Sequence, residues 1–132
     1  MGKVSTVIEL DLEIGVIYKY LENKYHSERY KKACIAVKGY IPDIELLESM
    51  DDEKLLFKVK GYDPLLRIHM GSWKWSYTLK ELGEYKTAVT FCYEWSVLME
   101  LFSLGTIKSQ AGNELVESVL ALEALEQALV SV

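Results

Sequence analysis

The chain has 132 residues and a formal net charge of −5 at neutral pH, with 50% hydrophobic and 27% charged residues. This size and composition predict one globular domain over 1–132 and exclude a disordered chain. The negative charge argues against nucleic acid as a partner. No apolar run is long enough to span a bilayer and no signal peptide is recognised, so we expect a cytoplasmic protein without stable membrane insertion. Its two cysteines, Cys34 and Cys92, are expected to be reduced thiols.

The first third of the chain predicts one strand and two short helices. Residues 4–10 are rich in β-branched side chains, which is typical of a strand. Asp11 is predicted to cap a helix, because its carboxylate can accept hydrogen bonds from the free amides of the first turn. A second helix is predicted over 27–33, with Ser27 as its cap. The first helix has an apolar stripe at spacings of three and four, which consists of Ile14, Ile17, Tyr18, Leu21 and Tyr25.

The middle of the chain predicts a run of antiparallel strands. Strands are expected over 43–50, 53–60 and 65–70, and the Gly-Tyr-Asp-Pro sequence at 61–64 predicts a turn. In the strand over 65–70, Arg67 and His69 would share the face opposite Ile68. Large apolar residues then switch from even to odd positions across Gly71, which predicts a β-bulge or a corner at this glycine.

Residues 72–97 form the most distinctive stretch, an aromatic hairpin of two strands. Large residues alternate with small or polar ones in both strands, so the large ones share one face. The turn is predicted at 81–84, with Gly83 adopting a positive φ. The large residues of this face are Trp73, Trp75, Tyr77, Leu79, Val89, Phe91, Tyr93, Trp95 and Val97.

The C-terminal part predicts an irregular segment over 98–105 and then one long helix. The helix is expected from about Thr106 to Val130, and its part over 109–130 is expected to lie across the concave face of the sheet. Its apolar stripe consists of Leu115, Val119, Leu122, Leu125 and Leu129. Its acidic residues Glu114, Glu117, Glu123 and Glu126 lie largely off that stripe.

The predicted order is strand, two short helices, a run of antiparallel strands and a long helix, which is an α+β arrangement. A sheet with one apolar face needs a second layer, and the long helix is the element big enough to supply it. This order resembles the START-like superfamily, also called SRPBCC or helix-grip proteins, which includes lipid-transfer START domains, polyketide cyclases and the major birch-pollen allergen. The resemblance implies a curved antiparallel sheet of about six or seven strands around the C-terminal helix.

Within that superfamily, the chain looks most like the small archaeal fatty-acid carriers of thermoacidophiles. The narrower likeness rests on the size, on the tail over 105–129 and on a thermophile-like scarcity of Asn and Gln. It implies a cavity between sheet and helix that holds an acyl chain. The residues expected to line the ligand are Phe57, Ile68, Trp73, Trp75, Tyr77, Phe91, Tyr93, Trp95, Phe102, Leu115, Val119 and Leu122. Arg67 and His69 are expected as contacts for a head group, after Tyr77 and Tyr93.

Three hypotheses remain open from the sequence, and a plainly filled aromatic core competes with the cavity. The first is a non-catalytic carrier of a long-chain fatty acid or a similar hydrophobic molecule. The second is an enzyme of the cyclase or aromatase type with Tyr77, Tyr93 or His69 as proton donors. The third is an interaction domain whose aromatic wall forms a homodimer interface. The two histidines have no partners at metal-ligand spacing, so neither a metal nor another cofactor is expected.

Overall fold

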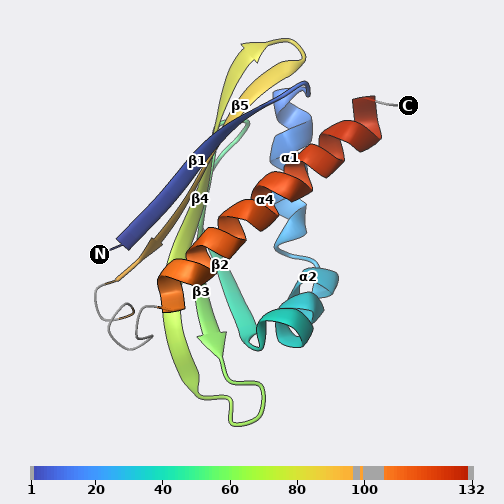
Figure 1. Cartoon of the computed structure of the whole chain (residues 1–132). Helices are drawn as coiled ribbons and strands as arrows, with labels where there is room; N and C mark the ends of the chain where they lie inside the picture. The colour runs from blue at the N-terminus through green and yellow to red at the C-terminus, as the bar shows by residue number, and fades with distance from the viewer. Residues whose placement is uncertain (1, 97–98, 100–105, 131–132) are drawn as a thin grey trace.

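A single antiparallel sheet and a long helix that crosses it make up the fold (Figure 1). The structure, a computed structural model, describes residues 2–96, 99 and 106–130. The strand order in the sheet is β1-β5-β4-β3-β2. The strands are β1 (Gly2–Leu10), β2 (Ile41–Met50), β3 (Lys54–Tyr62), β4 (His69–Gly83) and β5 (Lys86–Trp95). The helices are α1 (Ile14–Lys24), α2 (Glu28–Ala33), the π-helix η1 (Cys34–Lys38) and α4 (Thr106–Val130).

The aromatic hairpin is confirmed as the centre of the sheet. β4 and β5 pair so that Trp73 lies opposite Trp95, and Trp75 lies opposite Tyr93. All of these side chains are buried, because they point to the face that the helices cover. The sequence alternation therefore correctly predicts the inward face of the hairpin, whereas the turn lies at 84–85 and not at 81–84.

The segment after Tyr62 is a tight loop and not the strand predicted over 65–70. β4 begins only at His69, so the described sheet has five strands where six or seven were expected. The physical reason is turn chemistry: Asp63 Oδ1 accepts the backbone N–H groups of Leu65 and Leu66 at 2.8 and 2.7 Å. These amides are then not free to form a β ladder.

A bulge next to Gly71 confirms the predicted irregularity at this glycine. Gly61 pairs with Gly71, whereas the next residue, Tyr62, pairs with His69, so Met70 is the extra residue. Gly71 has a φ of 153°, which favours glycine. The bulge changes which side chains face inward, and the residues before it point away from the core.

Local caps and turns agree with the sequence in part. Ser27 Oγ accepts the backbone N–H of Tyr30 at 3.1 Å, which confirms the predicted cap of α2. The predicted cap at Asp11 is wrong, because Glu13 precedes α1 and makes no side-chain cap there. The predicted positive φ at Gly83 is also wrong: the hairpin closes beyond it, and the described glycines with positive φ are Gly39 and Gly71.

The inner face of the sheet is covered by the N-terminal helices as well as by α4 (Figure 1). α4 contacts β1 and β5, as predicted for the C-terminal helix, whereas α1 contacts β4 (Figure 1). α1 contributes Ile17 and Leu21, which are fully buried. The core thus lies between the sheet and a cover formed jointly by the N-terminal helices and α4.

Candidate functional site

A cleft of about 480 Å³ lies between η1 and the N-terminal half of α4. Lys38 and Tyr40 line it from the end of η1 and the segment before β2. Gly39, with a φ of 77°, lets the chain turn sharply between these two residues. From the opposite side, α4 contributes Ser109, Gln110, Asn113, Glu114 and Glu117. The cleft therefore brings together two segments that are far apart in the sequence.

A largely buried ion pair crosses this cleft. Lys38 Nζ contacts Glu114 Oε1 directly and lies 3.3 Å from Glu117 Oε2. Glu114 is only 8% exposed. Burial raises the pKa of the Glu114 carboxyl above its usual value, although Lys38 opposes this. Burial alone would lower the pKa of Lys38, but Glu114 and Glu117 outweigh it and raise that pKa.

A second ammonium group lies beside this pair. Lys24 Nζ is 5.9 Å from the centre of the Tyr30 ring, and Lys38 Nζ is 5.4 Å from the same ring. Both distances fit cation–π contacts. Burial lowers the pKa of Lys24, and within the described residues Lys24 forms no ion pair. Lys24 is therefore the cation with the most to gain from an added anion.

The inner wall of the cleft contacts the aromatic face of the sheet. The Tyr40 ring meets the Trp73 ring edge to face, with 5.2 Å between their centres. Gln110 Nε2 donates to the Tyr93 hydroxyl at 3.2 Å. Tyr40 and Gln110 thus separate the polar cleft from the aromatic interior.

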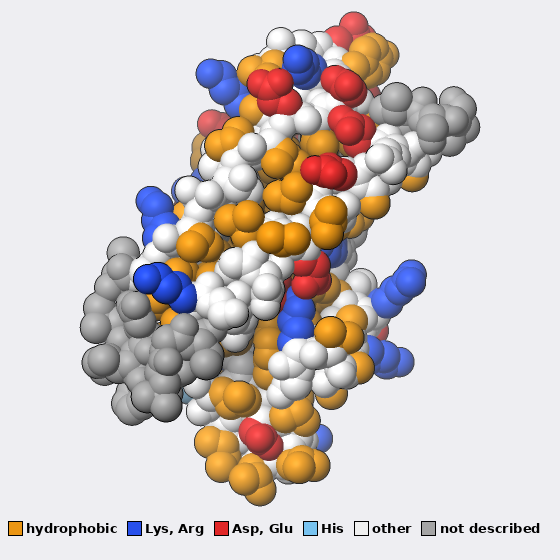
Figure 2. All heavy atoms as spheres, in the orientation of Figure 1, with side chains coloured by type: hydrophobic (Ala, Val, Ile, Leu, Met, Phe, Trp, Pro, Cys, Tyr) orange, Lys and Arg blue, Asp and Glu red, His pale blue; other side chains and the backbone are white. Residues whose placement is uncertain are grey.

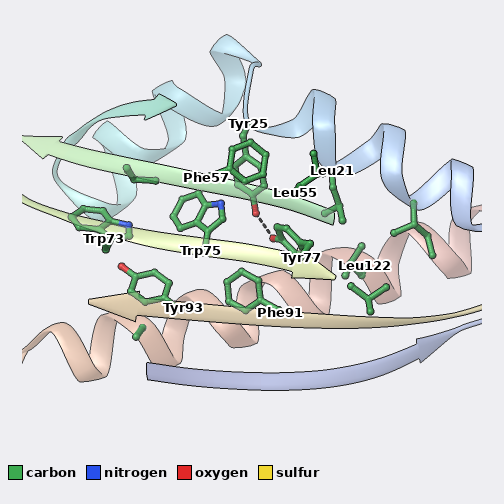
Figure 3. Close-up of a cluster of buried hydrophobic side chains, with 14 of the residues drawn as sticks. Leu21, Tyr25, Leu55, Phe57, Trp73, Trp75, Tyr77, Phe91, Tyr93 and Leu122 are labelled. Atoms are coloured by element: carbon green, nitrogen blue, oxygen red, sulfur yellow. Dashed lines mark hydrogen bonds between the residues drawn. The ribbon is translucent and has the colours of Figure 1, made fainter. Parts of the chain in front are cut away.

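The aromatic interior contains hydrogen-bond donors without acceptors. Figure 3 shows Trp73, Trp75 and Tyr93 as neighbours on β4 and β5. Trp73 Nε1 and Trp75 Nε1 have no hydrogen-bond partner among the described residues, and both side chains are buried. Such unpaired donors are uncommon in protein interiors, because burial removes their bonds to water. A ligand oxygen would satisfy them.

The hydroxyls of Tyr30 and Tyr40 are two further polar groups buried beside the aromatic interior. Neither makes a hydrogen bond of normal geometry within the described chain, and the Cys34 thiol is a polar neighbour of both. Burial raises the pKa of both tyrosines above the usual value, so both keep their protons. They are donors at neutral pH, not bases.

A chain of three hydroxyls connects α1, β4 and α4. The Tyr77 hydroxyl is hydrogen-bonded to the Tyr25 hydroxyl, as the dashed line in Figure 3 marks. It also lies 2.7 Å from Ser118 Oγ. Tyr77 is fully buried, and burial raises its pKa. Because both neighbours already occupy its hydroxyl, Tyr77 is a structural residue rather than a free contact for a head group.

The structure places most of the predicted ligand residues on the inner face of the sheet. Those that it buries together are Phe57, Trp73, Trp75, Tyr77, Phe91, Tyr93, Trp95 and Leu122. Leu115 and Val119 are only half-buried. Phe102 lies outside the described residues. The aromatic wall is covered by the chain's own helices, so it is not the homodimer surface considered above.

Ile68 is not part of the interior, contrary to the sequence prediction, and Arg67 and His69, which were expected as head-group contacts, also lie on the surface. Ile68 is 59% exposed, and Arg67 lies in the loop before β4 with a φ of 58°. His69 is exposed at the first position of β4. The bulge beside Gly71 and the turn formed by Asp63 turn all three side chains outward.

Sequence reasoning missed the charged centre of the cleft. It assigned Glu114 to the outer side of α4, whereas the buried face runs through Ile107, Ala111, Glu114, Ser118 and Leu122. These positions follow one another at spacings of three and four, so a helical wheel that admits polar residues would have found them. This spacing was visible in the sequence, but the usual rule that Glu and Ser side chains lie on the surface led to the opposite assignment.

Among the described residues, no cluster of three or more metal-ligating side chains occurs, and no helix is long and apolar enough to cross a membrane. The sheet order and the long helix across it define a helix-grip fold.

Comparison with solved structures supports this fold. No protein-family model and no curated protein matches the chain. A protein from Arthrobacter aurescens is similar, with 12% identity, a TM-score of 0.60 and coverage of 91% of this chain and 84% of that one. The Mll3558 protein from Rhizobium loti is 12% identical with a TM-score of 0.56, over 91% and 95% of the two chains. The Aha1 dimer from Colwellia psychrerythraea is 13% identical with a TM-score of 0.57, over 98% and 96%. At these identities the likeness concerns the fold alone.

Proposed function

We propose that this protein binds a hydrophobic carboxylic acid of the fatty-acid class and has no catalytic role. The observation that carries the proposal is the cleft lined by Lys38, because its inner wall of Tyr40 and Gln110 contacts the aromatic face of the sheet. One site therefore offers cations at its mouth and a large apolar surface behind them. An amphipathic acid has the same two parts.

The head group is assigned to the mouth of the cleft. Lys38 is already shared by Glu114 and Glu117, whereas Lys24 has no ion pair in the described chain. A carboxylate near both lysines adds one negative charge beside Glu114 and raises the pKa of Glu114 further. Binding is therefore accompanied by proton uptake, and affinity increases as the pH falls.

The hydrocarbon part is assigned to the interface between α4 and the aromatic face, which buried side chains fill in this structure. Each buried CH₂ group contributes about 0.8 kcal/mol, so a chain of moderate length supports micromolar binding with few polar contacts. To reach Trp73 and Tyr93, the chain has to displace Tyr40 or Gln110 from the inner wall. Longer chains then bind more tightly until the depth of the interior is used up.

The test is titration of tryptophan fluorescence with saturated fatty acids of increasing length. Lys24→Met is the informative variant, because it removes a cation that no ion pair holds and leaves Glu114 paired. We expect it to weaken binding about tenfold, and we expect Lys86→Met, at the far hairpin, to bind as the wild type does. Absence of saturable quenching at every length in the wild type would overturn the proposal.

An enzyme of the cyclase type is the second candidate. The observation that favours it is the set of unpaired donors, Trp73 Nε1 and Trp75 Nε1, which suit an oxygenated ring system better than a saturated chain. Glu114 is then the candidate acid, because its raised pKa lies closer to neutral pH. Mass spectrometry of molecules that co-purify with the native protein separates the two candidates. An oxygenated polycycle, together with loss of turnover but not of binding in Glu114→Gln, would favour the enzyme.

A further inference from the structure

The loop over 63–68, between β3 and β4, carries Leu65, the most exposed large apolar side chain among the described residues. Leu65 is 91% exposed and Leu66 is 72% exposed. Ile68 and Met70 are also exposed. In Figure 1 this loop projects from the lower end of the sheet, beyond the helices, and Figure 2 shows hydrophobic side chains gathered there. We propose that this loop docks the protein on the surface of an anionic lipid bilayer.

The loop is built so that its backbone amides are satisfied from within. Leu65 and Leu66 donate to Asp63 Oδ1, and Arg67 donates to the Asp63 carbonyl at 2.8 Å. The Asp63 N–H itself donates to the Ile68 carbonyl at 2.9 Å, and Pro64 has no N–H. From Asp63 to Arg67 no backbone N–H is left without an acceptor. This matters because a free backbone amide is costly to move from water into the apolar part of a bilayer.

The same hydrogen bonds direct the side chains outward. Arg67 adopts a left-handed φ of 58°, and Leu65 and Leu66 lie on the outer side of the turn that Asp63 organises. The apolar side chains therefore project from a short turn whose backbone hydrogen bonds are made within the loop. Exposed apolar side chains bind the interfacial region of a bilayer more strongly as they bury more apolar area there, and attraction to anionic lipids adds to this.

Charge distribution supports an anionic surface as the occupant. The loop end of the molecule carries cations without ion pairs in the described chain: Arg29, Lys32, Lys60 and Arg67. Acids are present at this end too, but Asp63 is occupied by the loop's own amides and Glu28 is paired with Lys31. The exposed acids Asp43 and Glu45 on β2 lie opposite Lys60 and Lys58 of β3.

The opposite end of the sheet is strongly acidic, as the red side chains in the upper part of Figure 2 show. The acids there come from the β2–β3 turn, the β4–β5 hairpin and the second half of α4. They are Asp51, Asp52, Glu53, Glu81, Glu84, Glu123 and Glu126. A negatively charged membrane therefore attracts the loop end and repels the far end, which orients the chain with its apolar loop toward the lipid.

The cleft of the candidate site opens toward the same end of the molecule as the loop. Val37, which lines the cleft, is 82% exposed and belongs to η1. η1 leads into β2, whose first residue Ile41 pairs with Tyr62 at the base of the loop. The cleft thus opens at the end of the molecule that faces the bilayer. Docking does not depend on the ligand assigned above, and failure of either proposal leaves the other open to its own test.

The test is flotation of the full chain with vesicles of phosphatidylcholine, with and without phosphatidylglycerol. We expect binding only to the anionic vesicles, with loss of binding in high salt. Leu65→Ser/Leu66→Ser should lower the partition coefficient on the order of tenfold. The matched control is Leu82→Ser/Tyr85→Ser, which removes two exposed apolar side chains from the hairpin at the acidic end and should bind as the wild type does.

Three results would overturn the proposal. The first is failure of anionic vesicles to retain the wild type even at low salt, and the second is a loss of binding in the control variant as large as that in the loop variant. The third is a wild-type dimer in light scattering that becomes a monomer in Leu65→Ser/Leu66→Ser without any vesicle binding, which assigns the loop to a second copy of the chain. The substituted leucines are exposed, so thermal melts should confirm that the loop variant folds normally. In buffer without vesicles, fatty acids should quench the tryptophan fluorescence of that variant as they quench that of the wild type.

Discussion

Lys38 and Glu114 are 76 residues apart in the sequence and form one ion pair across the cleft. Lys38 ends the π-helix η1, and Glu114 lies on the buried face of α4. The pair thus connects the N-terminal helical cover to the C-terminal helix at the mouth of the candidate site. Four predictions follow from this arrangement and from the packing around it.

Removal of Glu114 should destabilise the fold. Glu114→Ala leaves Lys38 half-buried with only Glu117, at 3.3 Å, as its partner. Removal of one partner of a buried pair costs about 3–5 kcal/mol, and we expect about 3 kcal/mol because Glu117 remains. Urea denaturation measures the loss. Glu123→Ala, at an exposed position of the same helix, should change stability by less than about 0.5 kcal/mol. Equal losses in the two variants would contradict a role for the pair.

The pH dependence of stability should report the burial of Glu114. Its pKa is raised in the folded protein, so the folded state binds the proton more tightly than the unfolded state does. The stability from this group is fully present below the unfolded pKa of about 4.3 and is lost as the pH rises through the folded-state pKa. Thermal melts across this range should therefore show wild type losing stability relative to Glu114→Gln as the pH rises. Parallel curves for the two proteins would show that Glu114 titrates normally.

The three-hydroxyl chain should contribute to stability through Tyr77. Tyr77→Phe removes the group that bonds both Tyr25 and Ser118, and it leaves two buried hydroxyls without this partner. An unsatisfied buried hydroxyl costs about 1–3 kcal/mol, and we expect a loss within that range in chemical denaturation. Tyr85→Phe serves as the control, because Tyr85 is exposed in the hairpin turn and its change should be close to neutral. A neutral Tyr77→Phe would mean that the hydroxyl chain has no net stabilising effect.

Gly61 should be required for the position of Trp73. A Cβ added at Gly61 would lie 2.9 Å from the Trp73 ring and 3.5 Å from the Tyr40 ring. Gly61→Ala therefore overpacks this contact and should cost about 1–3 kcal/mol, with a change in tryptophan emission. Gly112→Ala is the matched control: no atom lies within 4 Å of the added Cβ, and alanine favours the helix by up to about 1 kcal/mol. Destabilisation by Gly112→Ala and none by Gly61→Ala would contradict the close contact between Gly61 and Trp73.

The sequence by itself determined the aromatic hairpin and the long helix. Alternation with a period of two places Trp73, Trp75, Tyr93 and Trp95 on one face whatever else the chain does, and the structure buries all four on the inner face of the sheet. The α4 bounds also follow from local pattern. The turn formed by Asp63 is local as well, but its carboxylate-to-amide bonds compete with a strand pattern of equal length, and the strand was predicted instead.

Only the tertiary structure decided which face of α4 is buried and where the cleft lies. Glu114 and Ser118 are buried because Lys38 and Tyr77 meet them from other elements. A polar side chain can be buried when a partner replaces its lost hydrogen bonds to water. The periodicity of a helix does not reveal such a partner when it is far away in the sequence. The half-buried state of Leu115 and Val119 has the same cause, since the helix is rotated so that its polar groups reach their partners.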